Sequence, residues 1–534
     1  MHEMNVNCPT GDEVIGDWLD AHAAVHPDRT AIAFEGLSIT YLQLKSQVDR
    51  CAMRYLACGL RKGDCIAILS TPRPEAFISF LAAARIGALW LGLNPRYQIP
   101  ELSYVVGDSQ PRLLMSLDTI DGRSYAKDIE ALAAANSCIE TTVMIERREN
   151  GSSSFYDWIA TELPSAVRSE DLEAARRGVD VGTPALLVYT SGSSGKPKGV
   201  LLRHRELIRR SRTQNERFPT KTWPQVLNPL PINHIGGMHF MGLFAFIGAG
   251  TIHYSERFSA PEFVQALHSG RVNVLIVLPT MFKMMVDQPG FSANLLSRLE
   301  WFVFSGAAMA PELLEMILSS ACPIGLTYGM TETCGSVTYS DPNASIEVLT
   351  NTIGRAAPDG EVRVADAAGT PCMPGAPGEL QIRAQHCMGG YFGREQATRD
   401  AYTPDGWLRT GDTAIMRTDG NIHFIGRTSE MFKSGGYNVY PREVELALET
   451  LDAVVLSAVV SVPDPLFDEV GWAYVVPSPG RTVTETDLAE WSKSQLANYK
   501  VPKRFFVCSE LPLLPVGKVD KVKLKAQAVA ALAR

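Results

Sequence analysis

The sequence predicts an α/β fold with parallel sheets covered by helices, a small antiparallel β unit, and a smaller α+β part at the C-terminus. Short apolar runs alternate with segments of helical periodicity up to about Gly354. Polar–apolar alternation then replaces this pattern, and mixed α/β segments return after Gly426. The 534 residues exceed what one hydrophobic core supports, and 46% of them are hydrophobic, so several sizeable cores can form.

The short apolar runs predict buried strands, because a strand covered on both faces has a continuously apolar sequence. These runs span residues 64–70, 88–93, 185–189, 272–277, 301–304 and 324–327. Helical periodicity predicts helices over residues 74–86, 261–268 and 311–320. Each of these helices opens with proline, which the first helical turn tolerates. The strand–helix alternation indicates parallel sheets with helices on their faces.

Two further parts are predicted beyond residue 354. Alternating polar and apolar residues between Gly, Pro and Asp turns predict antiparallel strands over 361–365, 379–383 and 421–425. The pattern beyond them predicts helices over 441–449 and 485–496, strands over 453–460 and 472–476, and a basic tail. We expect roughly the last hundred residues to form a separate lid domain.

Charge and cysteine usage argue against several classes of protein. Asp plus Glu (58) exceed Lys plus Arg (50), and the net charge of −8 argues against a general nucleic-acid binder. The ten cysteines form no C-x-x-C pair, so a zinc ribbon is not supported and we expect reduced thiols.

Membrane and targeting signals are weak. Residues 1–20 lack a basic-then-apolar signal segment. The best membrane candidate, residues 236–254, contains five glycines and an inner histidine, which favours a buried segment over a lipid span. We expect a soluble, cytoplasmic protein without a stable membrane span, and the sequence leaves a homodimer open.

A loop rich in glycine, hydroxyl groups and lysine follows the apolar strand at 185–188. Its sequence, Tyr189-Thr-Ser-Gly-Ser-Ser-Gly-Lys-Pro-Lys-Gly199, predicts a polyphosphate site, because backbone N–H groups, hydroxyls and two lysines can converge on one anion. It is not a Walker A sequence, since Pro197 replaces the Ser/Thr that would hold magnesium. The candidate phosphate-binding residues are Thr190, Ser191, Gly192, Ser193, Ser194, Gly195, Lys196 and Lys198.

Two alternatives for this loop stay open. It could be a flexible solvent-exposed linker, although such linkers seldom follow a buried strand and carry two lysines. Ser193-x-x-Lys196 also matches the acylating serine motif of penicillin-binding enzymes, but the companion Ser-Asp-Asn and Lys-Thr-Gly motifs are missing.

The loop resembles the signature of the adenylate-forming superfamily, which includes acyl-CoA synthetases, aryl-CoA ligases, luciferases and peptide-synthetase adenylation domains. Further motifs are similar in order from Trp18 to Lys525. The resemblance implies a large N-terminal domain, residues 1–427, with two helix-covered mixed or parallel sheets and a small β unit. It also implies a mobile C-terminal lid domain, residues 428–534.

The motif Tyr328-Gly-Met-Thr-Glu-Thr333 follows the strand at 324–327. A carboxylate beside a polyphosphate needs a cation between them, so Glu332 is a candidate Mg²⁺ ligand, together with Thr190. A first-turn helix acid is the alternative for Glu332 alone. The resemblance implies that Tyr328 packs on adenine, that Thr331 lies near the α-phosphate, and that the turn from Ser305 contacts adenine. The remaining candidate nucleotide residues are Gly306, Ala307, Ala308, Thr327, Gly329 and Met330.

The segment Gly406-Trp-Leu-Arg-Thr-Gly-Asp412 resembles the one whose aspartate binds both ribose hydroxyls. One carboxylate can accept two hydrogen bonds from a diol, whereas a turn-capping role is the alternative. The resemblance implies that Arg427 contacts ribose and that Ser429 is the hinge, where the family usually has Asp or Lys. It places Ser434, Gly435 and Gly436 near the pantetheine arm of CoA.

Pro515-Val-Gly-Lys-Val-Asp-Lys521 resembles the motif with the family's catalytic lysine, which assigns Lys518. A solvated basic tail is the alternative. The segment from Asn228 to Gly236 resembles the one lining the acyl pocket and makes His234 a candidate gate. No Asp or Glu lies between residues 228 and 254, which favours an acid without an α-amino group. The candidate acyl-pocket residues are His234, Ile235, Met238, Ser305, Gly306 and Gly329.

The resemblance implies an ATP-dependent, Mg²⁺-requiring carboxylic acid–CoA ligase that forms an acyl adenylate from an apolar acid, with ATP and CoA as co-substrates. Lys518, Glu332, Thr190 and His234 are its candidate catalytic residues. A carrier-protein thiol, an amine or oxygen could replace CoA as the acceptor. A serine acyl-hydrolase using Ser193 and a non-catalytic nucleotide sensor are alternatives from other classes.

Overall fold

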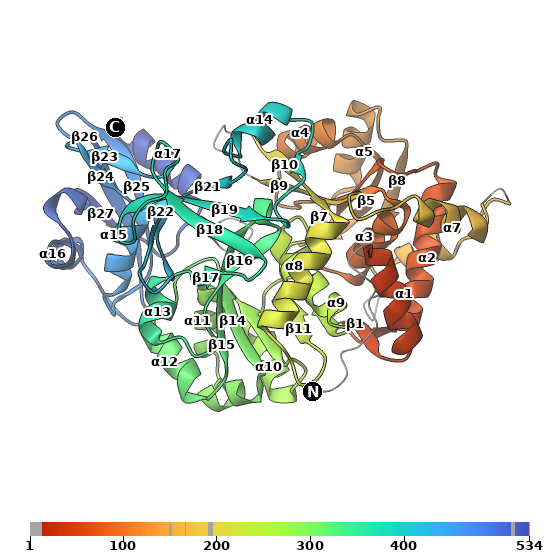
Figure 1. Cartoon of the computed structure of the whole chain (residues 1–534), viewed down its shortest axis with the longest axis horizontal. Coiled ribbons are helices and arrows are strands. Elements are labelled where there is room, and N and C mark those ends of the chain that lie inside the picture. Colours follow the sequence, from red (N-terminus) through yellow and green to blue (C-terminus); the bar gives the residue numbers. More distant parts are fainter. Residues whose placement is uncertain (1–12, 149–151, 166, 191–195, 514–517, 533–534) are drawn as a thin grey trace. The chain divides into compact units, whose positions relative to one another are not determined.

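The computed structural model describes residues 13–148, 152–165, 167–190, 196–513 and 518–532. The chain forms two compact units (Figure 1). Unit 1 comprises Met1–Ile346, Ala356–Gly360 and Ala384–Asp400. Unit 2 comprises Glu347–Arg355, Glu361–Arg383 and Ala401–Arg534.

The largest sheet of unit 1 has the strand order β20-β10-β9-β4-β3-β5-β8. The strands from β9 to β8 run parallel, while β10 and β20 are antiparallel to their neighbours. Strands β3 and β4 are buried along their whole length, as their continuous apolar sequences predict. The strands are β3 (Cys65–Leu69), β4 (Leu89–Leu93), β5 (Pro111–Leu117), β8 (Thr141–Ile145), β9 (Pro184–Thr190), β10 (Lys198–Arg203) and β20 (Gly390–Tyr391).

Helices from the first part of the chain pack around this sheet. Helix α3 is buried on every side, and α5 and α6 pack on β8. A small hairpin of β6 (Thr119–Ile120) and β7 (Arg123–Ser124) lies between β5 and α5 in the sequence. The helices are α1 (Ile15–Val25), α2 (Tyr41–Ala57), α3 (Pro74–Ile86), α4 (Ile99–Ser109), α5 (Ala126–Ala135), α6 (Ser154–Ala160) and α7 (Ser169–Arg177).

Two more sheets have the orders β11-β12-β1-β2 and β13-β14-β15-β16-β17. In the second, β13, β14 and β15 run parallel and β16 turns back antiparallel to β15. The strands are β1 (Thr30–Phe34), β2 (Leu37–Thr40), β11 (Gln225–Asn228), β12 (Thr251–Tyr254), β13 (Val274–Val277), β14 (Trp301–Ser305), β15 (Ile324–Met330), β16 (Gly335–Tyr339) and β17 (Arg355–Ala356).

The helical segments of this part include an eight-residue π-helix, Gly236–Leu243, which runs directly into α9. The α-helices are α8 (His204–Arg217), α9 (Phe244–Ile247), α10 (Ala260–Ser269), α11 (Pro279–Val286), α12 (Pro311–Ser319) and α14 (Glu395–Asp400). Short 3₁₀ turns cover Ala293–Arg298 and Thr331–Thr333.

Unit 2 contains the sheet β18-β19-β21-β22 and the sheet β24-β23-β26-β25, with β27 beside β26. In the first, β21 is antiparallel to both β19 and β22. Its elements are α13 (Ile346–Asn351), β18 (Gly360–Ala365), β19 (Pro377–Ala384), β21 (Leu408–Met416), β22 (Ile422–Arg427), β23 (Phe432–Ser434), β24 (Tyr437–Val439), α15 (Pro441–Glu449), β25 (Val454–Asp464), β26 (Asp468–Pro477), α16 (Glu485–Gln495), β27 (Arg504–Val507) and α17 (Lys521–Leu532).

The predicted α/β fold with mixed and parallel sheets is confirmed, and α3 covers the predicted range from Pro74 to Ile86. The prediction of a basic C-terminal tail is wrong, because α17 occupies those residues. Leu524 and Ala528 lie one helical turn apart and are buried in a core cluster with Val460 and Trp472. The lysines on both sides of Leu524, at positions 521, 523 and 525, obscured the helical pattern in the sequence.

The described residues can be searched for disulfides, metal sites and membrane-spanning helices. Nine cysteines fall within them and all nine are free thiols, while Cys8 lies outside. Nowhere in these ranges do three or more His, Cys, Asp or Glu side chains gather into a metal site built from protein ligands alone. Within the same ranges, no helix combines the length and the apolar character needed to cross a membrane.

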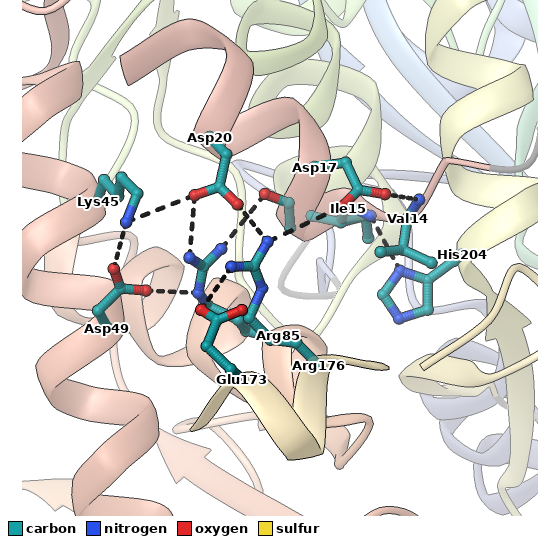
Figure 2. Close-up of polar contacts among 11 residues, drawn as sticks. Val14, Ile15, Asp17, Asp20, Lys45, Asp49, Arg85, Glu173, Arg176 and His204 are labelled. Atoms are coloured by element: carbon teal, nitrogen blue, oxygen red, sulfur yellow. Dashed lines mark hydrogen bonds and ion pairs between the residues drawn. The ribbon is translucent and has the colours of Figure 1, made fainter. Parts of the chain in front are cut away.

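A buried ion network joins four helices of unit 1 (Figure 2). Arg85 on α3 has a 1% exposed side chain and pairs with Asp20 of α1 at 2.9 Å and with Asp49 of α2. Arg176 of α7 pairs with the same Asp20, and Lys45 of α2 bridges Asp20 and Asp49. Arg85 is the buried member of this network, and its two ion pairs link α3 to α1 and to α2.

Replacing Arg85 with methionine should lower the free energy of unfolding by about 1.5–3 kcal/mol, because Asp20 and Asp49 lose their charged hydrogen-bond partner on α3 and keep only the more exposed Lys45 and Arg176. Urea unfolding followed by tryptophan fluorescence measures the change. The control is Lys62→Met, which removes the exposed Lys62–Asp180 pair and should cost about 0–1 kcal/mol. Equal effects of the two variants would show that the Arg85 network adds nothing to stability.

Candidate functional site

The predicted phosphate loop connects the antiparallel strands β9 and β10. In the ladder, Lys198 lies opposite Thr190 and Gly199 lies opposite Tyr189. The hairpin therefore brings the first candidate residue of the loop next to its last lysine. Five of the six candidates between them, Ser191, Gly192, Ser193, Ser194 and Gly195, lie outside the described residues.

Both arms of this loop are fixed by side chains from α4 and from the segment after β20. The Tyr189 hydroxyl donates to Asp108 Oδ2 at 2.8 Å, and Arg394 donates to Asp108 Oδ1 at 2.7 Å. Tyr104 receives a hydrogen bond from Arg394 at 3.1 Å and donates to the Pro197 carbonyl at 2.9 Å. Burial and the Asp108 hydrogen bond raise the pKa of Tyr189, so its hydroxyl keeps its proton. One network of Asp108, Arg394 and Tyr104 thus contacts the chain on both sides of residues 191–195.

Glu332 lies in the 3₁₀ turn between β15 and β16 and is 8% exposed. The Tyr391 hydroxyl donates to Glu332 Oε1 at 2.9 Å, and the Met388 N–H donates to the Glu332 carbonyl at 2.7 Å. Lys198 Nζ lies 5.1 Å from the centre of the Tyr391 ring, within cation–π range. Tyr391 therefore links the predicted phosphate-loop lysine with the predicted metal ligand, and sequence reasoning missed it.

The side chains around Glu332 fit a Mg²⁺ ion. Mg²⁺ binds by one or two carboxylates plus substrate phosphates and water, and it does not need a cage of protein ligands. A nearly buried carboxylate with one oxygen held by Tyr391, and a lysine beside that tyrosine, matches such a site. Thr190 is the last residue of β9, and its hydroxyl is the second candidate ligand.

The predicted adenine-contacting turns lie at the carboxyl ends of two adjacent parallel strands. Ser305 pairs with Thr327 across β14 and β15, and its hydroxyl donates to the Thr327 carbonyl at 2.8 Å. Ligands of open α/β sheets bind beyond such strand ends. A Cβ atom on Gly329 would lie 1.9 Å from the Gly335 carbonyl oxygen, so only glycine fits there.

Exposure differs among the other residues of these turns. Gly306, Ala307 and Gly329 are exposed, Ala308, Tyr328 and Met330 are half-buried, and Thr327 and Thr331 are buried. The exposed small residues leave a surface that a flat base can approach closely.

The candidate acyl-pocket residues His234, Ile235 and Met238 lie at the start of the π-helix. Ile235 and Met238 are buried, and His234 is half-buried. π-helical turns in proteins are frequent at functional sites. The same π-helix contains His239, a fully buried residue to which the sequence reasoning gave no role.

His239 Nε2 lies 3.1 Å from the Ser211 hydroxyl and 3.2 Å from the Leu207 carbonyl. Burial lowers the pKa of His239 to about 3, with Arg210 adding to the shift, so the ring is neutral. A Cβ atom on Gly335 would lie 3.2 Å from His239 Nδ1. The π-helix therefore packs against the turn that follows Glu332.

In unit 2, Asp412 and Arg427 are partners on adjacent strands β21 and β22. Arg427 Nε lies 2.9 Å from Asp412 Oδ1, and the Asp412 side chain is 1% exposed. Asp412 is thus a buried strand residue that pairs with the second predicted ribose contact, and the turn-capping alternative does not hold.

Lys518 belongs to the same electrostatic cluster. Although the residue as a whole is exposed, desolvation of its amine and the Arg427 guanidinium lower its pKa, while Asp412 and Glu430 oppose this shift. Leu513 and Val519 form a β-bridge around the Lys518 loop. Unit 2 therefore brings Lys518, Arg427 and Asp412 together.

The predicted hinge and CoA residues lie further along unit 2. Ser429 is exposed in the turn after β22. Gly435 and Gly436 connect β23 to β24 as a two-residue hairpin with φ values of 58° and 85°. Such a turn needs positive φ at both positions, which explains the Gly-Gly pair, and buried Ser434 precedes it.

The profile of the family described as "AMP-binding enzyme" matches residues 19–392, and that of the "AMP-binding enzyme C-terminal domain" matches residues 443–518. The chain belongs to the AMP-binding enzyme family. The second match ends at Lys518. The resemblance to adenylate-forming enzymes, in the branch of acyl-CoA ligases, is thereby confirmed.

Known members of the AMP-binding enzyme family are similar over nearly their full length. The indoleacetate–CoA ligase of Aromatoleum aromaticum is 32% identical, over 95% of this chain and 96% of that protein. The feruloyl-CoA synthase of an Amycolatopsis species is 30% identical, over 96% and 98%. The structure of o-succinylbenzoate coenzyme A synthetase from Bacillus subtilis in complex with ATP and a magnesium ion has a TM-score of 0.81 and 26% identity, over 96% and 100%.

Replacing Glu332 with glutamine should raise the Mg²⁺ concentration for half-maximal activity about tenfold or more, because the ion loses its carboxylate ligand. Pyrophosphate release measured across a Mg²⁺ titration tests this. The control Glu315→Gln changes an exposed glutamate on α12 and should leave the titration unchanged. If the Mg²⁺ titration curve of Glu332→Gln overlaid that of the wild type, Glu332 would not be a metal ligand.

Proposed function

We propose that this enzyme is an ATP-dependent carboxylic acid–CoA ligase. It activates an apolar acid as an acyl adenylate, releases pyrophosphate, and transfers the acyl group to CoA with release of AMP. The contact that supports this most is the Tyr391–Glu332 hydrogen bond beside Lys198, because it joins a phosphate-loop cation with a metal-binding carboxylate. The acyl-CoA ligases among the relatives support the same assignment.

The first half-reaction makes the acid a good acyl donor. A carboxylate cannot expel oxide, so its oxygen attacks the α-phosphorus of ATP and pyrophosphate leaves. In such phosphoryl-type transfers the protein acts mainly by positioning and charge neutralisation. Thr190, Lys196 and Lys198 hold the β- and γ-phosphates. Mg²⁺, held by Glu332 and Thr190, would neutralise phosphate charge when bound.

Lys518 neutralises the charge that develops between the α-phosphate and the attacking carboxylate, while Asp412 holds the ribose hydroxyls and Arg427 assists. We propose that residues 1–427 form the adenylation domain and residues 428–534 the lid. Movement about Ser429 then exchanges Lys518 for the Ser434–Gly436 hairpin, which admits the pantetheine thiol. The CoA sulfur attacks the acyl carbonyl and AMP leaves. No covalent enzyme intermediate forms.

The acid is apolar and lacks an α-amino group. The chain has no Asp or Glu between residues 228 and 254 to meet a substrate ammonium, and Ile235 and Met238 offer apolar side chains. Aryl, alicyclic and medium-chain fatty acids fit this description, and two relatives named for aromatic acids favour the aryl class. His234 gates the pocket.

The cytoplasmic location and the homodimer stay predictions.

The test is AMP formation from ATP with a panel of acids, with and without CoA. The panel contains indoleacetate, ferulate, cyclohexanecarboxylate and medium-chain fatty acids, and thioester is measured in parallel. We expect at least one apolar acid to give equal amounts of AMP and thioester only when CoA is present. If AMP formed with an amine or a carrier protein as acceptor but not with CoA, the assignment of CoA as the acceptor would be wrong. ATP binding without pyrophosphate release, or ATP-independent hydrolysis with labelling of Ser193, would overturn the adenylating function.

A further inference from the structure

Lys521 is the most strongly paired lysine near Lys518. It begins α17, three residues after Lys518, and its side chain is 22% exposed. Its amine lies 2.6 Å from Glu430 Oε2 and 2.7 Å from Glu445 Oε1. Burial opposes its charge, but the Glu445 and Glu430 carboxylates outweigh this and raise the pKa of Lys521. Lys521 is therefore a fixed ammonium group between two carboxylates.

The two carboxylates belong to segments that are themselves well held. Glu430 follows the proposed pivot Ser429, and its backbone N–H donates to the Arg427 carbonyl at 3.1 Å. Glu445 on α15 is 2% exposed and accepts a hydrogen bond from the Val459 N–H at 2.9 Å. Lys521 thus ties the start of α17 both to the segment beside the pivot and to the body of unit 2.

Two backbone contacts hold the residues that join Lys518 to Lys521, at the described end of the loop that carries Lys518. Val519 forms a β-bridge with Leu513, and the Asp520 N–H donates to the Pro512 carbonyl at 2.8 Å. A displacement of residue 521 would therefore move residues 519 and 520 and the adjoining Lys518 backbone.

Glu430 is the 2.6 Å partner of Lys521, and its negative charge also opposes the lowering of the Lys518 pKa. A carboxylate without a partner would attract the nearer mobile ammonium group. In the native arrangement Lys521 satisfies Glu430, so Lys518 is not drawn into that ion pair.

We propose that Lys521 is a positioning residue for Lys518: it occupies Glu430 and anchors the loop, so that the Lys518 amine stays available for the acyl-adenylate step. This inference rests on the proposed function, and it assigns Lys521 no contact with substrate.

The test is Lys521→Met, assayed separately in the two half-reactions with the acid that the wild type uses best. We expect kcat for pyrophosphate release to fall about 30-fold, because a displaced catalytic group loses its orientation. Thioester formation from supplied acyl adenylate should stay within about threefold, since that step does not use Lys518. Lys521→Arg, which keeps the charge, should stay close to the wild type.

A second substitution separates positioning from mere stability. In Lys521→Met, adding Glu430→Gln removes the carboxylate that captures Lys518, and pyrophosphate release should recover at least about fivefold. A purely structural lysine would lower both half-reactions together, and Glu430→Gln would not restore either. If Lys521→Met does not fold, Lys521→Gln gives the same pair of measurements.

The matched control is Lys525→Met on the next turn of α17. Lys525 contacts Ser461 at 2.7 Å and Glu469 at 3.6 Å and has no contact with Glu430. It should leave both half-reactions unchanged. An active wild type with an unaffected Lys521→Met would overturn the positioning role alone, whereas a wild type without acid-dependent pyrophosphate release would overturn the proposed function.

Discussion

Electrostatic repulsion between a carboxylate and a triphosphate is the constraint on which the proposed account depends. Both reactants are anions, so they can meet only where fixed cations offset their charge. The chain has a net charge of −8, and therefore the positive groups must be local. Lys198 beside Tyr391 and Glu332 supplies one such group in unit 1, and Lys518 beside Arg427 and Asp412 supplies another in unit 2.

The carboxylates in the neighbourhood of these cations have partners of their own. Glu332 accepts from Tyr391, Asp412 pairs with Arg427, and Glu430 pairs with Lys521. An unpaired carboxylate in any of these places would compete with substrate phosphate for the nearby lysine. The pairing explains how a lysine-poor, acidic chain can present positive charge to an anionic ligand.

The sequence predicted those features that follow from local pattern. Continuous apolar runs predicted β3 and β4, and the helical period of Pro74–Ile86 predicted α3. Asp412 and Lys518 were assigned by resemblance to motifs of the adenylate-forming superfamily, and Glu332 by that resemblance together with its place beside a polyphosphate site; their roles stay predictions.

Contacts between distant segments could not be predicted in this way. Tyr391 lies 59 residues from Glu332 in the sequence, and Asp108 lies 286 residues from Arg394. Such pairs depend on strand order, here on β20 pairing with β10, which no local pattern encodes. α17 was missed because lysines stand on both sides of its buried Leu524. His239 was missed because an apolar segment with one histidine usually indicates only a core residue.

The most direct measurement replaces Lys518 with alanine and follows each half-reaction alone. The account predicts that acid-dependent pyrophosphate release falls about a thousandfold or more, because the cation that offsets charge in the transition state is lost. Thioester formation from supplied acyl adenylate and CoA should remain within a few fold of the wild type. An equal loss in both half-reactions, or an unchanged rate of pyrophosphate release, would contradict the claim that this lysine serves the adenylate-forming step.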